Sequence, residues 1–388
     1  MLLAPGDIPY WRLAGFYFFY FSFVGAFAPY WSLYLRDLQF SAFQIGVLMS
    51  LLQVMRIFAP PAWGWVADHT GRRSLVIQLA AALSVVSFAG VFFGTTFAWM
   101  FAVMALTSFF WGASLPLVEA TTLAHLGAGA AGYGRIRSWG SIGFIAAVIG
   151  IGYLLDRVPI GVLPWAVTAL MSGIVVFARL VPDASVPPHE SDQFPVWAIL
   201  RRPEVAALLA ACFLMAAAHG PYYTFYSLYL VDHDYSKASV GWLWSIGVVF
   251  EIGVFFAMPS LAGRFGLRRI LLASFAAAVL RFLLIGWGVG YPALLVVAQV
   301  LHALTFGAYH ASAVAVIHHF FRGRHQAKGQ ALYTGLSFGA GGTLGGLFSG
   351  AAWEPLGASL TFSAASLAAL LGGWLIAARL RLPASPAG

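Results

Sequence analysis

Residues 64–73 have the sequence GWVADHTGRR and lie between two long apolar runs. Gly64, Asp68, Gly71, Arg72 and Arg73 follow the spacing Gly-x-x-x-Asp-x-x-Gly-basic-basic. Because each flanking run is long and apolar enough to be a membrane helix, the stretch predicts a tight basic turn between two such helices.

The chain around this turn is too apolar for a water-soluble protein. Of its 388 residues, 61% are hydrophobic and only 9% are charged, and the mean hydropathy is +0.85. Such a chain cannot cover a water-facing surface with polar groups. Apolar stretches of about 20 residues occur twelve times along it. The sequence therefore predicts an all-α membrane protein with twelve transmembrane helices.

Basic residues are distributed unevenly between the predicted turns. If the N-terminus is cytoplasmic, sixteen arginines and lysines fall in inner segments, whereas only Arg36, Arg157 and Lys237 fall in outer ones. The positive-inside rule then places both termini in the cytoplasm. The net charge of +8 accordingly marks topology and contact with anionic headgroups rather than a nucleic-acid surface.

An internal repeat divides the chain into two halves. A shift of 195 residues places Ser32 on Ser227 within a shared SLYL tetrapeptide, and it aligns glycines 25, 46, 71, 112, 134 and 140 with glycines 220, 241, 266, 307, 329 and 335. We therefore predict two pseudo-symmetric six-helix bundles, residues 1–181 and 203–388. A polar cytoplasmic linker, residues 182–202, joins them.

Ionisable side chains inside the predicted spans mark the candidate site. They are Arg56, Glu119, Arg137, Glu251 and Arg281, with the histidines His219, His302 and His310. Burying an isolated charge in hydrocarbon costs several kcal/mol, so these groups should face a wet cavity or one another. The repeat also places Arg56 on Glu251, so equivalent helices carry opposite charges, and this asymmetry indicates where function lies.

The arginines and Glu119 each have a structural and a functional interpretation. Glu119 and Arg137 can pair across a helical hairpin, or they can bind substrate or a proton. Arg56 and Arg281 stay protonated at any usable pH, which suits a bidentate clamp on a carboxylate where little water competes. Alternatively, they neutralise Glu251 and Glu119.

Glu251 is the first candidate for a proton carrier. A low-dielectric cavity favours its neutral form and a nearby arginine favours its charged form. Binding of substrate to the arginine can therefore couple proton uptake to substrate exchange. His302 and His310 are eight positions apart, a little over two helical turns, so both side chains can project from one side of the helix. Histidine can relay protons near physiological pH; a hydrogen bond to a neighbouring helix is the alternative.

Aromatic residues crowd the first and seventh spans. Many are expected at the membrane interfaces or against lipid, while Tyr17, Tyr20 and Tyr223 are candidates to stack on a ring-bearing solute. The histidines have no cysteine or carboxylate companions at metal-ligand spacing, and no nucleophile, base and orienting group lie together. We expect no metal, no cofactor and no enzymatic activity.

The spacing in residues 64–73 resembles the loop between the second and third helices of major facilitator superfamily transporters, although His69 stands where a permanent cation is usual. That resemblance implies two bundles that rock about a site near the midplane. It also implies that Asp68 latches the cytoplasmic side, by accepting hydrogen bonds from the adjoining helix start or from Arg72. We expect this cytoplasmic gate in Gly64, Asp68, Gly71, Arg72 and Arg73.

A narrower resemblance runs over nearly the whole chain. Residues 116–120 (PLVEA), 133–144 (YGRIRSWGSIGF), 280–282 (LRF) and 301–310 (LHALTFGAYH) are similar to the phenylpropionate permease group, which is related to lactose-permease-like proteins and nucleoside proton symporters. The resemblance implies that Glu119 and Arg137 bind substrate and that Arg281, Glu251 and His310 act in proton coupling. The acid that such proteins carry beyond the tenth-span histidine is absent here, so Glu251 or Glu119 would have to carry the proton.

These observations predict a proton-coupled importer in a bacterial inner membrane. It should bind a small organic solute, most readily an aromatic or other carboxylate, and work as a monomer driven by the proton gradient. A sugar or nucleoside proton symporter is the alternative. A drug exporter or a non-transporting receptor with the same fold is a further one.

Overall fold

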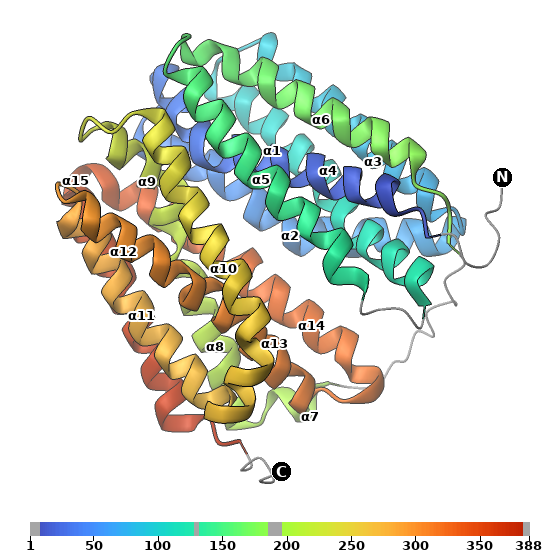
Figure 1. The fold of residues 1–388 in the computed structure, drawn as a ribbon, viewed down its shortest axis with the longest axis vertical. Helices are drawn as coiled ribbons and strands as arrows, with labels where there is room; N and C mark the ends of the chain where they lie inside the picture. The colour runs from blue at the N-terminus through green and yellow to red at the C-terminus, as the bar shows by residue number, and fades with distance from the viewer. Residues whose placement is uncertain (1–7, 128–131, 185–195, 383–388) are drawn as a thin grey trace.

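The computed structural model describes residues 8–127, 132–184 and 196–382, which fold into helices joined by short turns (Figure 1). The first half contains α1 (Tyr10–Asp37), α2 (Ala42–Thr70), α3 (Arg73–Phe88), α4 (Phe97–Leu126), α5 (Tyr133–Leu155) and α6 (Leu163–Leu180). The second contains α7 (Trp197–Leu200), α8 (Pro203–Ala218), α9 (Gly220–Val231), α10 (Lys237–Phe265), α11 (Leu267–Gly288), α12 (Pro292–His302), α13 (Tyr309–Phe320), α14 (Gln326–Thr334) and α15 (Gly342–Arg379).

Eleven helical segments in the described ranges are long and apolar enough to cross a membrane. The last of them, residues 326–379, has 54 residues and bends at Gly357, where φ is +79° and ψ is 168°. A helix of that length would extend about 80 Å at 1.5 Å per residue, far beyond a hydrocarbon core of about 30 Å. It therefore makes two crossings, and the predicted all-α fold with twelve spans is confirmed.

The internal repeat is visible in how equivalent helices begin and end. α2 begins at Ser41, whose hydroxyl accepts from the Gln44 amide, and α10 begins at Ser236, 195 residues later, in the same way. α2 ends at Gly71 (φ +63°) and α10 at Gly266 (φ +75°). Because positive φ is accessible to glycine at little cost, the repeated glycines end both helices at the same place.

The turn around Gly71 is shorter than its sequence predicts. Residues 64–70 belong to the last two turns of α2, and only Gly71 and Arg72 separate this helix from α3. The helix continues to Thr70 because residues 64–70 contain no proline to interrupt the backbone ladder. Asp68 therefore projects from a helix end rather than from a loop.

The helices gather into two groups (Figure 1). α1 packs on α5 and α6 and α4 packs on α2 and α3, whereas α15 packs on α8, α9 and α11. The groups meet where α1 contacts α9, α2 contacts α15 and α5 contacts α10. The predicted linker, residues 182–202, lies mainly at 185–195, outside the described residues, so the proposed boundaries at 181 and 203 stay a prediction.

Glycines allow the closest approaches between the groups. A Cβ built on Gly46 of α2 would lie 2.8 Å from the Gly350 Cα of α15, and one on Gly241 of α10 would lie 2.6 Å from the Val148 carbonyl oxygen of α5. Gly46 and Gly241 are equivalent in the repeat. Each therefore brings its helix into backbone contact with the other half.

Polar contacts hold the two groups together where α1, α5 and α9 end and α10 begins. Arg36 forms an ion pair with Asp232. The Asp156 carboxylate accepts hydrogen bonds from the backbone amides of Lys237 and Ala238, at 2.8 and 3.0 Å, where α10 begins. A carboxylate at a helix N-terminus is favoured by the free amides and the helix dipole.

We expect Asp156→Ala to loosen this end more than Arg36→Ala does. The capping interaction is worth about 1 kcal/mol, whereas an exposed ion pair contributes about 0.5 kcal/mol. Spin-label distances across this end should report a larger open population for Asp156→Ala. The matched control is Asp37→Ala, an exposed acid at the same end without a side-chain hydrogen bond among the described contacts. Equal distances in all three variants would contradict the assignment.

Candidate functional site

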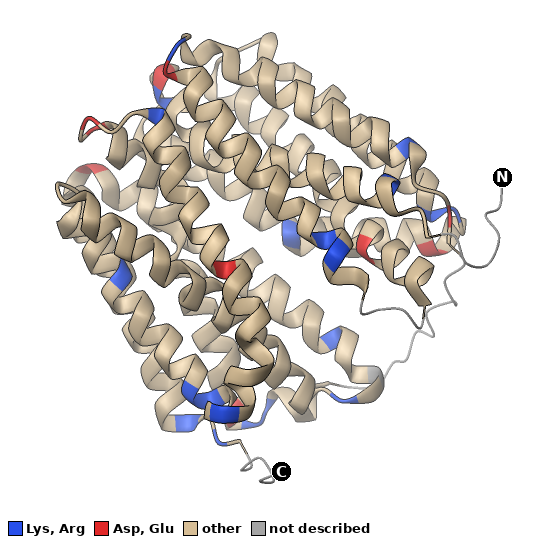
Figure 2. Cartoon of the chain, viewed as in Figure 1, with Lys and Arg blue, Asp and Glu red and all other residues tan. Residues whose placement is uncertain are grey.

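A cavity of about 300 Å³ lies between the two groups of helices. That volume is at the lower end of what sites for small organic molecules occupy. The first half contributes residues of α1, α2, α4 and α5, and the second contributes residues of α8 to α10, of the tenth span and of residues 338–346. Figure 2 shows that acidic and basic residues are sparse along the middle of the helices, so each charge in this cavity is an exception.

Two arginines make one wall of the cavity positive. Arg56 of α2 has its Cζ 5.7 Å from the centre of the Phe338 ring, and no carboxylate in the described ranges lies within ion-pair distance of it. Arg137 of α5 lies 3.9 Å over the Phe21 ring. A cation without an acidic partner is costly at this depth, so the Arg56 guanidinium is available to an anion.

Glu119 stands behind Arg137 rather than in the cavity. Its Oε1 lies 3.9 Å from Arg137 Nε and accepts a hydrogen bond of 3.1 Å from the Tyr133 hydroxyl. Glu119 is absent from the cavity wall. In this conformation it balances and orients Arg137, and it leaves Arg56 unpaired.

Glu251 and His302 face the cavity from the second half. Glu251 Oε2 lies 3.8 Å from His302 Nε2, and their side chains are 17% and 8% exposed. The helix opposite Glu251 is π-helical from Ala303 to Ala308, and a Cβ at Gly307 would lie 3.1 Å from Glu251 Cγ. A π-helical turn within a helix often marks a functional site, and here the glycine in it makes room for the acid.

Arg281 lies behind the cavity wall and is fully buried. Its Nε donates to the Ala298 carbonyl at 3.0 Å, and its guanidinium lies 4.1 Å over the ring of Tyr222, which does line the cavity. Arg281 Nη2 has no hydrogen-bond partner in the described part of the chain. This buried cation therefore acts on the cavity through Tyr222 and reaches no solute directly in this conformation.

Three histidines occupy different positions. His219, at the junction of α8 and α9, lines the cavity, and its Nδ1 donates a hydrogen bond of 2.8 Å to the Met215 carbonyl oxygen, so Nδ1 carries a proton. His302 also lines the cavity. His310 does not, and its Nδ1 lies 2.9 Å from the Tyr333 hydroxyl. Only His219 and His302 are therefore in reach of a bound solute.

Among the candidate tyrosines, Tyr223 lines the cavity and Tyr17 and Tyr20 do not. The Tyr17 hydroxyl bonds Thr122 at 3.1 Å, and the Tyr20 ring stacks on Trp111 at 4.6 Å between centroids. Tyr20 thus supports Trp111, whose own ring forms part of the wall. Tyr17 and Tyr20 are packing residues behind the site in this conformation.

Several wall residues were not among the candidates. They are Gln53, Trp111, Tyr222, Trp244, Thr305, Phe306 and Phe338. Gln53 offered a signal, because an amide within an apolar span resembles an intramembrane charge in its need for a partner. The tryptophans and phenylalanines offered none, since aromatics are common throughout these spans.

The residues of the predicted gate make their polar contacts within the first half, as far as the structure is described. Asp68 Oδ1 is 3.5 Å from Arg73 Nη2, and its side chain is 52% exposed. No polar contact within the described ranges joins Asp68 to Arg72 or to the second half. Among the described contacts, Asp68 is therefore joined only to Arg73 of its own half, whereas Arg36 and Asp156 join the two halves at the opposite end.

Comparison with known proteins gives a consistent result. The model of the MFS_1 like family matches residues 10–364. A protein of Escherichia coli (strain K12) named "Probable 3-phenylpropionic acid transporter" is 28% identical over 351 residues, which cover 89% of this chain and 92% of that protein.

Two further relatives differ in what they are named for. The maltose permease of Geobacillus stearothermophilus is 28% identical over 374 residues, which cover 94% of each chain. The crystal structure of the nucleoside transporter NupG superposes with a TM-score of 0.82 at 20% identity and covers 96% of this chain and 99% of that one. The structural likeness extends over the whole fold.

Proposed function

Since this chain belongs to the MFS_1 like family and is a secondary transporter of the major facilitator type, we propose that it imports a small aromatic carboxylate together with protons. The site works by alternating access between the two bundles. The proposed location is a bacterial inner membrane, with both termini in the cytoplasm and the chain acting as a monomer.

The unpaired Arg56 is the observation that carries the substrate class. Its guanidinium faces a largely apolar, half-enclosed space, where a bidentate pair with a carboxylate is stronger than in water. The aromatic side chains of Trp111, Tyr223, Trp244 and Phe338 line the same space and suit a ring. A relative named for phenylpropionic acid supports the same class.

Proton coupling is proposed for Glu251 with His302. A carboxyl group that lies across one cavity from Arg56 can hold a proton while the arginine is bound to the substrate anion. When the anion leaves, the free guanidinium favours the carboxylate, and the proton is released on the same side. His302, 3.8 Å away, provides the first step of a proton path.

The proposed topology makes this structure the inward-open form. The closed end, held by Asp156 and Arg36, would face outward, and the separated end near Asp68 would face the cytoplasm. Substrate release to the inside follows from that arrangement. A drug exporter or a non-cycling receptor would share the fold, and vesicle uptake discriminates both of them from an importer.

A nucleoside or sugar symporter is the second candidate. Gln53 lines the cavity beside Arg56, and an amide suits the hydroxyls of a sugar or the edge of a base. Relatives named for maltose and for nucleosides favour it too. In that case Arg56 would have to stay unpaired in the bound state, which is why we rank the carboxylate first.

Counterflow in proteoliposomes tests the substrate class. Liposomes loaded with 3-phenylpropionate should take up the labelled acid, and its uncharged amide should compete at least about tenfold less well, because a charged hydrogen bond contributes about 1.5–3 kcal/mol. Uridine and maltose serve as the comparison solutes. Counterflow of either one without any response to the acid would overturn the carboxylate proposal.

A further inference from the structure

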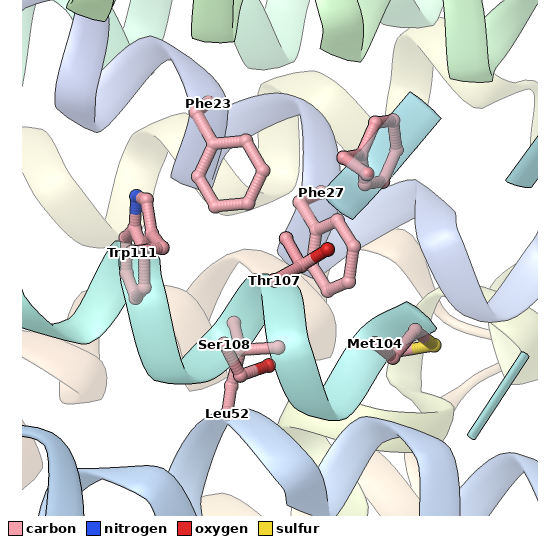
Figure 3. Close-up of a pocket in the computed structure, with 8 residues that line it drawn as sticks. Phe23, Phe27, Leu52, Met104, Thr107, Ser108 and Trp111 are labelled. Atoms are coloured by element: carbon pink, nitrogen blue, oxygen red, sulfur yellow. The ribbon is translucent and has the colours of Figure 1, made fainter. Parts of the chain in front are cut away.

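A second, much smaller pocket adjoins the cavity on the first-half side (Figure 3). It has a volume of about 10 Å³ and is lined by α1, α2, α3 and α4. Phe27, Leu52 and Trp111 line both this pocket and the cavity. A space of this size holds roughly one oxygen atom with its hydrogens.

Two hydroxyl groups in the small pocket have no hydrogen-bond partner within the described residues. Thr107 and Ser108 are only 4% and 2% exposed, yet Thr107 Oγ1 and Ser108 Oγ are both unpaired. Thr121 and Thr122, further along α4, instead donate to the carbonyls four residues earlier, at 2.8 and 2.7 Å. Serine and threonine hydroxyls within a helix can take that bond. Thr107 and Ser108 do not, and both hydroxyls belong to the wall of the small pocket.

The wall residues that the small pocket shares with the cavity include one that lies close to Arg56 along α2. Leu52 precedes Arg56 by four residues on α2, and Thr107 precedes Trp111 by four residues on α4, in each case a little over one helical turn. An aromatic ring that packs on Trp111, with its carboxylate at Arg56, would therefore lie next to the wall that Thr107 and Ser108 form.

We propose that Thr107 and Ser108 form a specificity subsite for a single hydroxyl group on the ring of the transported acid. The inference rests on the proposed function, because it takes the carboxylate to be held at Arg56. Both side chains can donate and accept, so a phenolic oxygen would satisfy both at once. The preferred substrate is then a ring-hydroxylated aromatic acid rather than the unsubstituted one.

Competition assays on the purified full chain test the subsite. The probes are 3-phenylpropionate and its three ring-hydroxylated isomers, each competing against counterflow of the labelled unsubstituted acid. One hydroxylated isomer should compete roughly three- to tenfold better than the unsubstituted acid, the range expected of one or two neutral hydrogen bonds. In the double variant Thr107→Val, Ser108→Ala that ratio should fall to about one.

The matched control is Ser114→Ala. Ser114 is on the same helix, is buried and has an unpaired hydroxyl, but it lines neither pocket. It should keep the wild-type ratio. If the double variant is not recovered in folded form, Ser108→Ala alone removes one hydroxyl with little change in volume. It should reduce the logarithm of the preference for the hydroxylated isomer by about half.

The outcomes separate the subsite from the proposed function. If no isomer outcompetes the unsubstituted acid, or if the double variant keeps the preference, the pocket holds only water and the subsite is overturned while carboxylate transport stands. If no aromatic acid competes at all, whereas uridine or maltose does, the proposed function and the subsite fall together.

Discussion

Arg56→Gln should lower the affinity for an aromatic carboxylate by roughly 30- to 100-fold. The guanidinium has no acidic partner among the described residues, so the bound anion would supply its only salt bridge. Removing one member of a buried, hydrogen-bonded charge pair costs 2–5 kcal/mol; we take the lower part of that range because the Arg56 side chain is only half-buried. Counterflow competition measures this affinity.

Arg56→Lys sharpens the test. It keeps the charge but loses the planar fork that binds a carboxylate through two parallel hydrogen bonds, so we expect an intermediate loss of roughly fivefold to tenfold. Arg157→Gln, a substitution of an exposed arginine outside the cavity, is the matched control. An equal loss of affinity for the acid and for its uncharged amide would contradict a charge-specific role.

The second large effect concerns Glu251. An inward gradient of one pH unit can drive about tenfold accumulation of a solute that enters with one proton. Glu251→Gln should reduce this to simple equilibration and should retain exchange of labelled for unlabelled solute, because a glutamine can mimic the protonated acid but cannot release a proton. Substrate accumulation and exchange are measured on the same proteoliposomes.

Glu119→Gln is the discriminating companion variant. Glu119 lies outside the cavity and pairs with Arg137, so its loss should weaken binding by freeing Arg137 and should leave the accumulation ratio unchanged. If Glu119→Gln abolishes accumulation and Glu251→Gln preserves it, the proton carrier is misassigned. The two variants are compared at one substrate concentration, well above the dissociation constant, so that weaker binding is not mistaken for loss of coupling.

Much of the fold could be predicted because membrane helices follow simple rules. Apolar length predicted the spans, and the constant spacing between Ser41 and Ser236, and between Gly71 and Gly266, corresponds to shared helix starts and ends. The repeat also paired Arg56 with Glu251, and both line one cavity. The extent of the turn at Gly71 was misjudged because helix continuation depends on backbone bonding that residue type alone does not reveal.

Membership of the cavity was harder to predict. Hydropathy indicates how deep a residue lies, but a span that is apolar on all sides has no stripe to show which face meets the cavity. Arg281 and Arg56 both lie deep within their spans. Arg281 is on a helix face that is buried behind Tyr222, whereas Arg56 is on a face that lines the cavity. Tyr20 and Tyr223 differ in the same way. Thr107 and Ser108 could not be singled out from the sequence because serine and threonine are common in spans; only their lack of a hydrogen-bond partner among the described residues distinguishes them.

Proton-coupled import of a carboxylate is tested most directly by measuring the proton movement that accompanies substrate entry. Proteoliposomes that contain a pH-sensitive dye receive 3-phenylpropionate outside, without an imposed gradient and with lipid-only vesicles as the control for passive diffusion of the acid. Acidification of the lumen should exceed the control with the wild-type protein, and this excess should be lost in both Arg56→Gln and Glu251→Gln. Acidification on addition of uridine or maltose, with no protein-dependent response to the carboxylate, would contradict it.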